Sequence, residues 1–395
     1  MNPSPADIPL APARPTRAIV DLDRIASNLS VLRARVKGAR VFPVVKANAY
    51  GHGAPAVAAC LERSGADALC VALLEEGVEL RREGISCPIL VINALPPGLI
   101  GPAIENRITP TLYRTGLLEA VEAAGAKVGR PAGFHLKIDT GMTRLGLSPE
   151  ELPGFLDRLA ASRWARMEGI YSSLACADRP DDPLNAKQVA AYEACLRAII
   201  ARGLSCGIRH LANSSAISFL PGTLYDAVRP GILIYGVPPV AGDDAVPVLP
   251  ALTLVTEVAQ IRAVPAGTPV GYAASWRAEG PRTLAVLPAG YDDGMIRSLS
   301  NQGVVLVNGL PAPVIGRVSM DLSVVDVTAC GTVREGDEAV LIGSQGSGTI
   351  TAWDVARRAG TIPWEVLCRV GGRVPRDYVR EGHPAGRWSR WERHA

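Results

Sequence analysis

The sequence lacks the features that mark several classes of protein. None of its apolar runs approaches the roughly 20 residues that a membrane-spanning helix needs, and the Pro- and Ala-rich first 17 residues lack the apolar centre of a secretory signal. Neither sign of charge is in excess, because 41 Lys and Arg against 38 Asp and Glu give a formal net charge of +3. We therefore expect a cytoplasmic protein whose partner is a small molecule, not a nucleic acid or a membrane.

Paired cysteines and clustered histidines are also missing. The eight cysteines form no CxxC pair and have no histidine close enough in sequence to complete a zinc finger, so reduced thiols, mostly in the core, are expected. Five histidines, two of them in the last 13 residues, leave little for a histidine-based metal site, and we expect no metal. His52 and His210 are expected to be hydrogen-bonded interior groups, with His210 supporting Arg229.

What the sequence does contain is enough apolar material for a large core, at 395 residues and 48% hydrophobic. Short β-rich runs alternate with helical stretches up to about residue 235, which is typical of βα units. The runs are Val41–Val45, Ala68–Ala72, Ile89–Ile92, Ile108–Leu112, Phe134–Ile138, Met167–Tyr171, Ile208–Leu211 and Ala227–Ile232. Eight such strands, with no GxGxxG after the first, favour an N-terminal (β/α)8 TIM-like barrel over residues 17–250.

The pattern changes after the Pro-rich segment 237–250. Val, Thr and Ile runs then alternate with Gly and Pro turns, which predicts a C-terminal all-β domain over residues 251–382, and the fold class is α/β. The GSQGSG sequence at 343–348 is expected to be a hairpin turn and not a phosphate loop. Residues 1–16 are expected to be a disordered tail, and residues 383–395, with Trp388 and Trp391, a second tail.

Residues that directly follow the predicted strands carry the candidate chemistry, because barrel enzymes act at the C-terminal ends of their strands. Lys46 follows the first strand, where desolvation and nearby cations could make it a Schiff-base or general-base lysine; pairing with a carboxylate at the surface is an equal alternative. Ser214 and Gly231 follow strands seven and eight, where barrels often hold a phosphate. A lysine together with a phosphate cup points to pyridoxal phosphate.

A set of short motifs in a fixed order gives the chain a resemblance to the alanine racemase family, from about Arg17 to Arg376. The motifs are VVKANAYGHG (44–53), KIDTGMTRLG (137–146), HLANSSA (210–216), VRPG (228–231), VGYAASW (270–276), GYDDG (290–294), GRVSMD (316–321) and TIPWEV (361–366). The resemblance implies a barrel-type pyridoxal 5'-phosphate enzyme that racemises alanine as a homodimer with shared active sites. It implies a supply of D-alanine for peptidoglycan.

The resemblance also assigns roles to individual residues. Lys46 would be the Schiff-base lysine and one catalytic base, and Tyr272 of the second subunit would be the other. The cofactor would be bound by Lys46, Tyr50, Arg144, Asn213, Ser214, Arg229, Gly231, Ile232 and Trp364. The substrate would be bound by Arg144, Met320 and Asp321, Lys137 would be carbamylated, and Asp178, Tyr291 and Arg297 would line the substrate channel.

The chemistry of racemisation is consistent with these roles. Two bases must flank the α-carbon, and contributions from two subunits let them approach from opposite faces. Arg229 opposite the pyridine nitrogen would keep that nitrogen unprotonated, because arginine does not give up its proton. Asp139 is expected to cap the loop that carries Arg144. Two positions depart from the family pattern: Ser173 replaces the usual His, and Trp364 replaces the usual Tyr.

Three alternatives stay open at this stage. A broader or serine-preferring racemase is possible because Trp364 changes a position that could set pocket size. A barrel decarboxylase would place an acid at the pyridine nitrogen, where this chain has Arg229. A non-catalytic pyridoxal-phosphate-holding protein would consist of the barrel alone, without the β domain that carries Tyr272 and Asp321.

Overall fold

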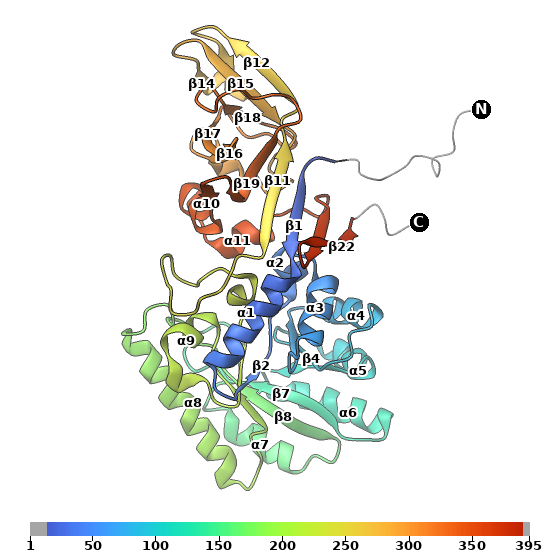
Figure 1. Ribbon diagram of the computed structural model, residues 1–395. Coiled ribbons are helices and arrows are strands. Elements are labelled where there is room, and N and C mark those ends of the chain that lie inside the picture. The colour runs from blue at the N-terminus through green and yellow to red at the C-terminus, as the bar shows by residue number, and fades with distance from the viewer. Residues whose placement is uncertain (1–13, 390–395) are drawn as a thin grey trace, which may run out of the picture. The chain divides into compact units, whose positions relative to one another are not determined.

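The structure is a computed structural model that describes residues 14–389, and it divides into two compact units (Figure 1). One unit contains residues 24–49 and 54–249; the other contains the described residues up to 23, residues 50–53 and those from 250 onward. The sequence pattern predicted that the barrel domain begins at residue 17. In the structure, strand β1 (Arg17–Asp21) instead pairs with β11 (Leu252–Glu257) and β21 (Arg376–Arg380) of the second unit.

The first unit is a closed barrel of eight parallel strands, as the sequence predicts. Its strands are β2 (Arg40–Val41), β3 (Leu69–Val71), β4 (Ile89–Val91), β5 (Ile108–Thr109) with β6 (Thr111–Leu112), β7 (Ala132–Lys137), β8 (Ala165–Tyr171), β9 (Ile208–His210) and β10 (Ala227–Val228). They pair in the orders β2-β10-β9-β8-β7-β6 and β3-β4-β5. A parallel bridge between Val44 and Cys70 joins the first strand to β3, and β5 leads almost directly into β6, so the ring closes.

Helices alternate with the strands, α1 preceding β2, and the longer ones cover the outside of the barrel (Figure 1). They are α1 (Leu22–Arg35), α2 (Lys46–Tyr50), α3 (Ala54–Arg63), α4 (Leu74–Arg82), α5 (Pro97–Glu105), α6 (Leu118–Val128), α7 (Leu152–Ala160), α8 (Pro183–Ala201) and α9 (Ser214–Phe219). Local sequence explains the ends of these helices. Asp182 caps α8 by accepting a hydrogen bond from Leu184 N–H, and Gly129 ends α6 in the left-handed conformation, at φ 71°.

The second unit is built mainly from antiparallel strands. Besides β1, β11 and β21, they are β12 (Gln260–Val264), β13 (Pro269–Val270), β14 (Trp276–Arg277), β15 (Arg282–Leu287), β16 (Val304–Val307), β17 (Leu310–Ile315), β18 (Ser323–Asp326), β19 (Glu338–Gln345), β20 (Gly348–Ile350) and β22 (His383–Trp388). Two helices that were not predicted, α10 (Ala352–Ala359) and α11 (Pro363–Cys368), interrupt this series. The segment 343–348 contains the turn of the β19–β20 hairpin, as expected, with residues 346–347 between the paired strands.

Both ends of the described chain are bound into the second unit, although tails were expected there. Thr16 is buried and its hydroxyl lies 2.8 Å from that of Thr256, and Arg14 forms an ion pair with Asp293. At the other end, β22 pairs antiparallel with β21, and Trp388 packs its ring 5.4 Å from the guanidinium of Arg376. Residues 1–13 and Trp391 lie outside the described residues.

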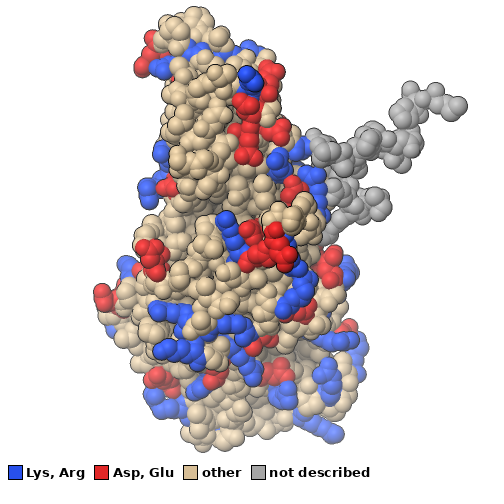
Figure 2. Space-filling model, in the orientation of Figure 1, with Lys and Arg blue, Asp and Glu red and all other residues tan. Residues whose placement is uncertain are grey.

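Two further expectations concern the whole chain. All eight cysteines are free thiols, and six of them are buried, as predicted. Among residues 14–389, no helix combines the length and the apolar character that crossing a bilayer requires. Positive and negative side chains both occur on both units over the face shown in Figure 2.

Candidate active site

Lys46 directly follows the first barrel strand and opens the short turn α2. Residues 47–49 of this turn have φ angles of 52° to 53°, a left-handed conformation that costs non-glycine residues about 1–2 kcal/mol each. Glu76 from α4 fixes the turn, because its carboxylate accepts hydrogen bonds from the N–H groups of Ala47 at 2.7 Å and Ala72 at 2.8 Å. Lys46 thus stands at the end of a barrel strand on a strained and supported turn, a kind of backbone that clusters at functional sites.

Four of the expected cofactor-binding residues lie together at the ends of strands seven and eight. The hydroxyl oxygen of Ser214 accepts a hydrogen bond from the N–H of Gly231 at 2.9 Å. Asn213 caps α9 by accepting from Ala216 N–H at 3.0 Å, and Ile232 begins a 3-10 helix. The N-terminus of α9 and that of the 3-10 helix are therefore joined through the Ser214 hydroxyl. Backbone N–H groups of small residues at helix N-termini suit an anionic group.

Arg229 is buried beside these residues and is held by neutral acceptors. One of its terminal nitrogens lies 2.6 Å from Nδ1 of His210 and donates to the His210 carbonyl at 2.9 Å. The other donates to the carbonyl of Ser172 at 2.7 Å. His210 supports Arg229, as the sequence analysis expected. No carboxylate among residues 14–389 forms an ion pair with Arg229, so its charge is uncompensated by acids of the described chain.

Lys137 is a second buried cation in the same barrel. Its Nζ donates to the hydroxyl of Ser173 at 3.3 Å and lies 4.4 Å from the centre of the Tyr171 ring. Burial, reinforced by the charges of Arg229 and Arg144, lowers the pKa of Lys137 to about 7. The amine is therefore partly neutral near physiological pH, which is the form that reacts with electrophiles.

Asp139 shapes the loop that presents Arg144, as expected. Its carboxylate accepts four backbone hydrogen bonds, from Gly141, Met142, Thr143 and Arg144. Although burial acts to raise the pKa of Asp139, these four bonds outweigh it and lower the pKa. The carboxylate is thus an ionised cap and not a poised base, while the side chain of Arg144 remains exposed.

Five of the other expected residues surround one depression of about 600 Å³ in the second unit. They are Tyr272, Tyr291, Arg297, Met320 and Asp321. The Tyr272 side chain is 72% exposed and that of Met320 is 50% exposed. Residues from three separate motifs, together with Arg297, therefore converge on a single surface of the second unit.

Arg373 holds Asp321 in this depression. Its Nη1 lies 2.7 Å from an oxygen of Asp321, and its other nitrogens bind both oxygens of Asp293 at 2.8 and 3.0 Å. Asp293 is fully buried and is also bound by Arg14. The buried acid anchors the arginine, and the arginine in turn orients the more exposed acid.

Three other expected residues lie in separate places. Tyr50 is buried at the end of α2, Trp364 is half-buried in α11, and Asp178 is exposed in the loop after β8. Their assigned roles remain predictions. The departure at Ser173 has a visible consequence, because its hydroxyl is engaged by Lys137 and its carbonyl by Gln188.

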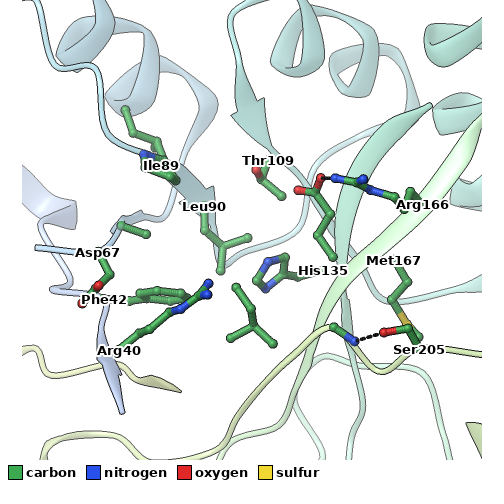
Figure 3. A pocket seen from close by; sticks show the side chains of 15 residues that line it. Arg40, Phe42, Asp67, Ile89, Leu90, Thr109, His135, Arg166, Met167 and Ser205 are labelled. Atoms are coloured by element: carbon green, nitrogen blue, oxygen red, sulfur yellow. Dashed lines mark hydrogen bonds and ion pairs between the residues drawn. The ribbon is translucent and has the colours of Figure 1, made fainter. Parts of the chain in front are cut away.

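A cavity of about 480 Å³ lies elsewhere, among residues at the starts of the barrel strands (Figure 3). Arg40, Thr109, His135 and Arg166 are among the side chains that line it, and none of the expected site residues does. Barrel enzymes act at the opposite ends of their strands. The cavity is therefore separate from the candidate active site, although His135 contacts His210.

Sequence reasoning missed several residues that support the site. His135, Glu76 and Arg373 were not singled out, because each acts through another residue that lies far away in the sequence. For His135 a signal was present: His135 and Lys137 are polar residues two positions apart in an apolar strand, so both point to the same face. The described residues contain no group of three or more His, Cys, Asp or Glu that could hold a metal ion.

Comparisons with known proteins extend over nearly the whole chain. Residues 20–239 match the family described as "Alanine racemase, N-terminal domain", and residues 251–378 match "Alanine racemase, C-terminal domain". An alanine racemase of Sorangium cellulosum is 41% identical over 380 residues, covering 92% of this chain and 99% of the relative. An alanine racemase of Symbiobacterium thermophilum is 42% identical over 369 residues, covering 93% of this chain and 98% of the relative.

Solved structures give the same result. The alanine racemase of Bacillus anthracis with bound L-Ala-P superimposes with a TM-score of 0.90 at 34% identity, covering 95% of this chain and 98% of that one. The enzyme of Bartonella henselae, solved with covalently bound pyridoxal phosphate, gives a TM-score of 0.84 at 32% identity and covers 93% of this chain and 100% of its own.

Proposed function

Because this chain belongs to the alanine racemase family, we propose that it interconverts L-alanine and D-alanine with pyridoxal 5'-phosphate. The observation that carries this proposal is the buried Arg229, which can only donate hydrogen bonds and is held by neutral acceptors. A decarboxylase would need an acid at that position. We further propose a cytoplasmic enzyme that supplies D-alanine for peptidoglycan.

The residues at the strand ends fit the cofactor. Ser214, Gly231 and Ile232 offer a hydroxyl and backbone N–H groups to a phosphate, and Lys46 offers an amine to an aldehyde. Tyr50, Asn213, Arg144 and Trp364 complete the proposed binding set. When bound, pyridoxal phosphate supplies an electron sink that acidifies the α-carbon of alanine.

The chain's own groups then move the proton. Lys46 Nζ removes or returns it on one face of the α-carbon, and the phenolic oxygen of Tyr272 from a second subunit does so on the other face. In support of a shared site, Tyr272 is highly exposed within its own chain, and Met320 and Asp321 lie beside it. The proposed enzyme is therefore a homodimer.

Arg229 would control where the proton returns. Arg229 would donate to the ring nitrogen of the cofactor and leave it unprotonated, which would weaken the electron sink. Arg229 would thereby disfavour the misplaced protonation that leads to transamination. The proton returns to the α-carbon, as racemisation requires.

Lys137 is proposed to be carbamylated. The reaction forms a bond between the neutral amine and the carbon of CO2 and releases one proton, so it needs an unprotonated lysine. The lowered pKa of Lys137, at about 7, supplies that form. The resulting carbamate would be an anion within the influence of the cations of Arg229 and Arg144, whose charges both act on Lys137.

Optical rotation of L-alanine solutions tests the proposed function. The purified protein with pyridoxal phosphate should bring L-alanine to an equal mixture of enantiomers, and serine, lysine and arginine should react more slowly. Lys46→Ala should lose both the reaction and the visible absorbance of the bound cofactor. Failure of the wild-type protein to racemise alanine, with the cofactor bound, would overturn the proposal.

A further inference from the structure

Two histidines and Arg229 form a linear hydrogen-bonded chain inside the barrel. Nδ1 of His210 lies 2.6 Å from Arg229 Nη1, and Nε2 of His210 lies 2.8 Å from Nδ1 of His135. All three side chains are buried: His210 is inaccessible, and His135 and Arg229 are each 6% exposed. Among residues 14–389, each ring nitrogen of His210 therefore has one hydrogen-bond partner, Arg229 at Nδ1 and His135 at Nε2.

Arg229, at one end of this hydrogen-bonded series, determines which ring nitrogen of each histidine carries the proton. A guanidinium carries donors and no acceptor, so Nδ1 of His210 must accept from Arg229. His210 then carries its proton on Nε2 and donates it to His135, whose Nδ1 must accept. The His135 proton is left on its own Nε2. Burial, followed by the charge of Arg229, lowers the pKa of both histidines, that of His135 to about 3, so both rings are neutral.

We propose that His135 is a positioning residue for racemisation, because it fixes the tautomer of His210 and thereby holds Arg229 in place. Without an acceptor at this position, His210 is free to carry its proton on Nδ1. That proton would point at a guanidinium donor, and the 2.6 Å contact would be lost. Arg229 would then be held only by the carbonyls of residues 172, 210 and 211.

His135 performs this role from outside the reaction site. It lines the cavity at the starts of the barrel strands, where Figure 3 shows its ring among the lining side chains. The His135 ring meets the edge of the His210 ring at 4.9 Å between centroids, and His210 in turn stacks on Tyr171 in the barrel interior. The inference rests on the proposed function only where it predicts kinetics; the tautomers are a property of the protein itself.

Nitrogen NMR tests the tautomer without reference to activity. In the 15N-His-labelled full-length protein, Nδ1 of His210 should show the shift of an unprotonated nitrogen and Nε2 that of a protonated one. His135→Leu should cause exchange between the two forms, while His135→Asn should retain the single form because its amide oxygen replaces Nδ1. A His210 protonated at Nδ1 in the wild-type protein would overturn the proposal.

Kinetics of the same variants test the consequence for the enzyme. His135→Leu should lower kcat for alanine by at least about tenfold with little change in KM, and should speed the loss of cofactor to pyridoxamine phosphate. His135→Asn should stay within about threefold of the wild type, and Met167→Leu, a change in the same cavity wall, should match the wild type. Equal losses in His135→Leu and His135→Asn would contradict a role for the acceptor.

Chemical rescue separates this role from a purely structural one. His135→Ala leaves a space that opens into the cavity of about 480 Å³, so added imidazole can reach Nε2 of His210. We expect imidazole to restore kcat in His135→Ala and to suppress the formation of pyridoxamine phosphate. Absence of rescue in a folded, cofactor-loaded variant would count against the proposal. If the wild type does not racemise alanine, the proposed function fails while the NMR result still decides the tautomer.

Discussion

Lys137 places an amine inside the barrel with no described acid paired to it. Because its pKa is lowered from 10.5 to about 7 on folding, the unfolded chain binds more protons than the folded chain between these values. The stability of the protein should therefore rise with pH across this interval through Lys137, and the cost of its charge is greatest below about pH 7. The wild type thus carries a stability penalty that is removable by mutation.

Lys137→Met should raise the free energy of unfolding by roughly a few kcal/mol at pH 6 and by progressively less as the pH approaches 10. Urea unfolding in CO2-free buffers at several pH values measures the difference between variant and wild type. Lys127→Met, which removes a 74% exposed lysine, should show no such trend. A difference that does not change with pH would show that Lys137 is not the source of the penalty.

Arg376 is the clearest structural arginine of the second unit. It is buried, and its guanidinium donates to the carbonyls of Gly51, Val370, Gly371 and Val374 at 2.6 to 3.0 Å. A compact ammonium cannot reach four acceptors spread in this way. Arg376 therefore joins the segment after α2 to the loop before β21.

Arg376→Lys should lower the free energy of unfolding by about 3 kcal/mol, because several buried carbonyls lose their donors. The change should appear as a lower urea midpoint at an unaltered slope. The matched substitution Arg380→Lys, in the same strand, should have little effect. Equal stability of Arg376→Lys and Arg380→Lys would mean that the four hydrogen bonds of Arg376 make no net contribution to the free energy of unfolding.

At the scale of elements, the turn α2 depends on Glu76. One carboxylate oxygen accepts a hydrogen bond from Ala47 N–H and the other from Ala72 N–H. An amide in its place would replace one of these acceptors with an NH2 donor that faces an N–H group. We expect Glu76→Gln to loosen the left-handed turn and displace Lys46. The variant should bind pyridoxal phosphate more weakly and lose activity by about tenfold.

Absorbance titration with the cofactor and the rate of alanine racemisation measure these effects. Glu75→Gln is the control, because Glu75 is the exposed neighbour in the same helical turn. Its affinity and rate should equal those of the wild type. Should Glu76→Gln behave like this control, the turn must hold its conformation without the carboxylate.

Sequence patterns located those elements whose partners are near in the chain. The eight barrel strands were predictable because each buried apolar run is bounded by turns and pairs with the next. The pairings of β1 with residues near 255 and 376 were not, since nothing local in Arg17–Asp21 specifies them. The pairing of β22 was missed for a similar reason: its sequence, HPAGRW, reads as a polar tail until β21 and Arg376 are placed beside it.

The same distinction holds for the candidate site. Lys46, Ser214 and Arg229 were visible because they stand directly after strands or within motifs. The residues that hold them were not, because Glu76 carries no unusual local pattern, and the polar residue His135 in an apolar strand does not reveal its partner; both act only once the barrel has closed. Supporting residues depend on tertiary contacts, and one sequence does not contain those explicitly.

At the scale of the whole molecule, the surface around Tyr272 needs explanation. Tyr272, Met320 and Leu322 expose 72%, 50% and 46% of their areas, and Tyr291 exposes 37%. All four line the same depression. Apolar surface gathered in this way is typical of a protein interface. The proposed homodimer would cover it and would carry each Tyr272 to the Lys46 of the other subunit.

Subunit complementation tests this arrangement directly. Lys46→Ala and Tyr272→Phe should each be nearly inactive alone. In a mixed dimer with shared sites, one site contains the intact Lys46 of one chain and the intact Tyr272 of the other, while the second site contains neither. Random assembly makes half of the dimers mixed, so co-expressed variants should recover about one quarter of wild-type activity.

The control combines Lys46→Ala with a chain that carries both substitutions, and this mixture should stay inactive because no intact Tyr272 can meet an intact Lys46. Differently tagged chains allow the mixed dimer to be isolated, and it should have about half of the wild-type activity, since one of its two sites is complete. If each site used Lys46 and Tyr272 of a single chain, no mixture of the two single variants could recover activity. Inactivity of an isolated, cofactor-loaded mixed dimer would therefore reject the shared site, whatever the oligomeric state.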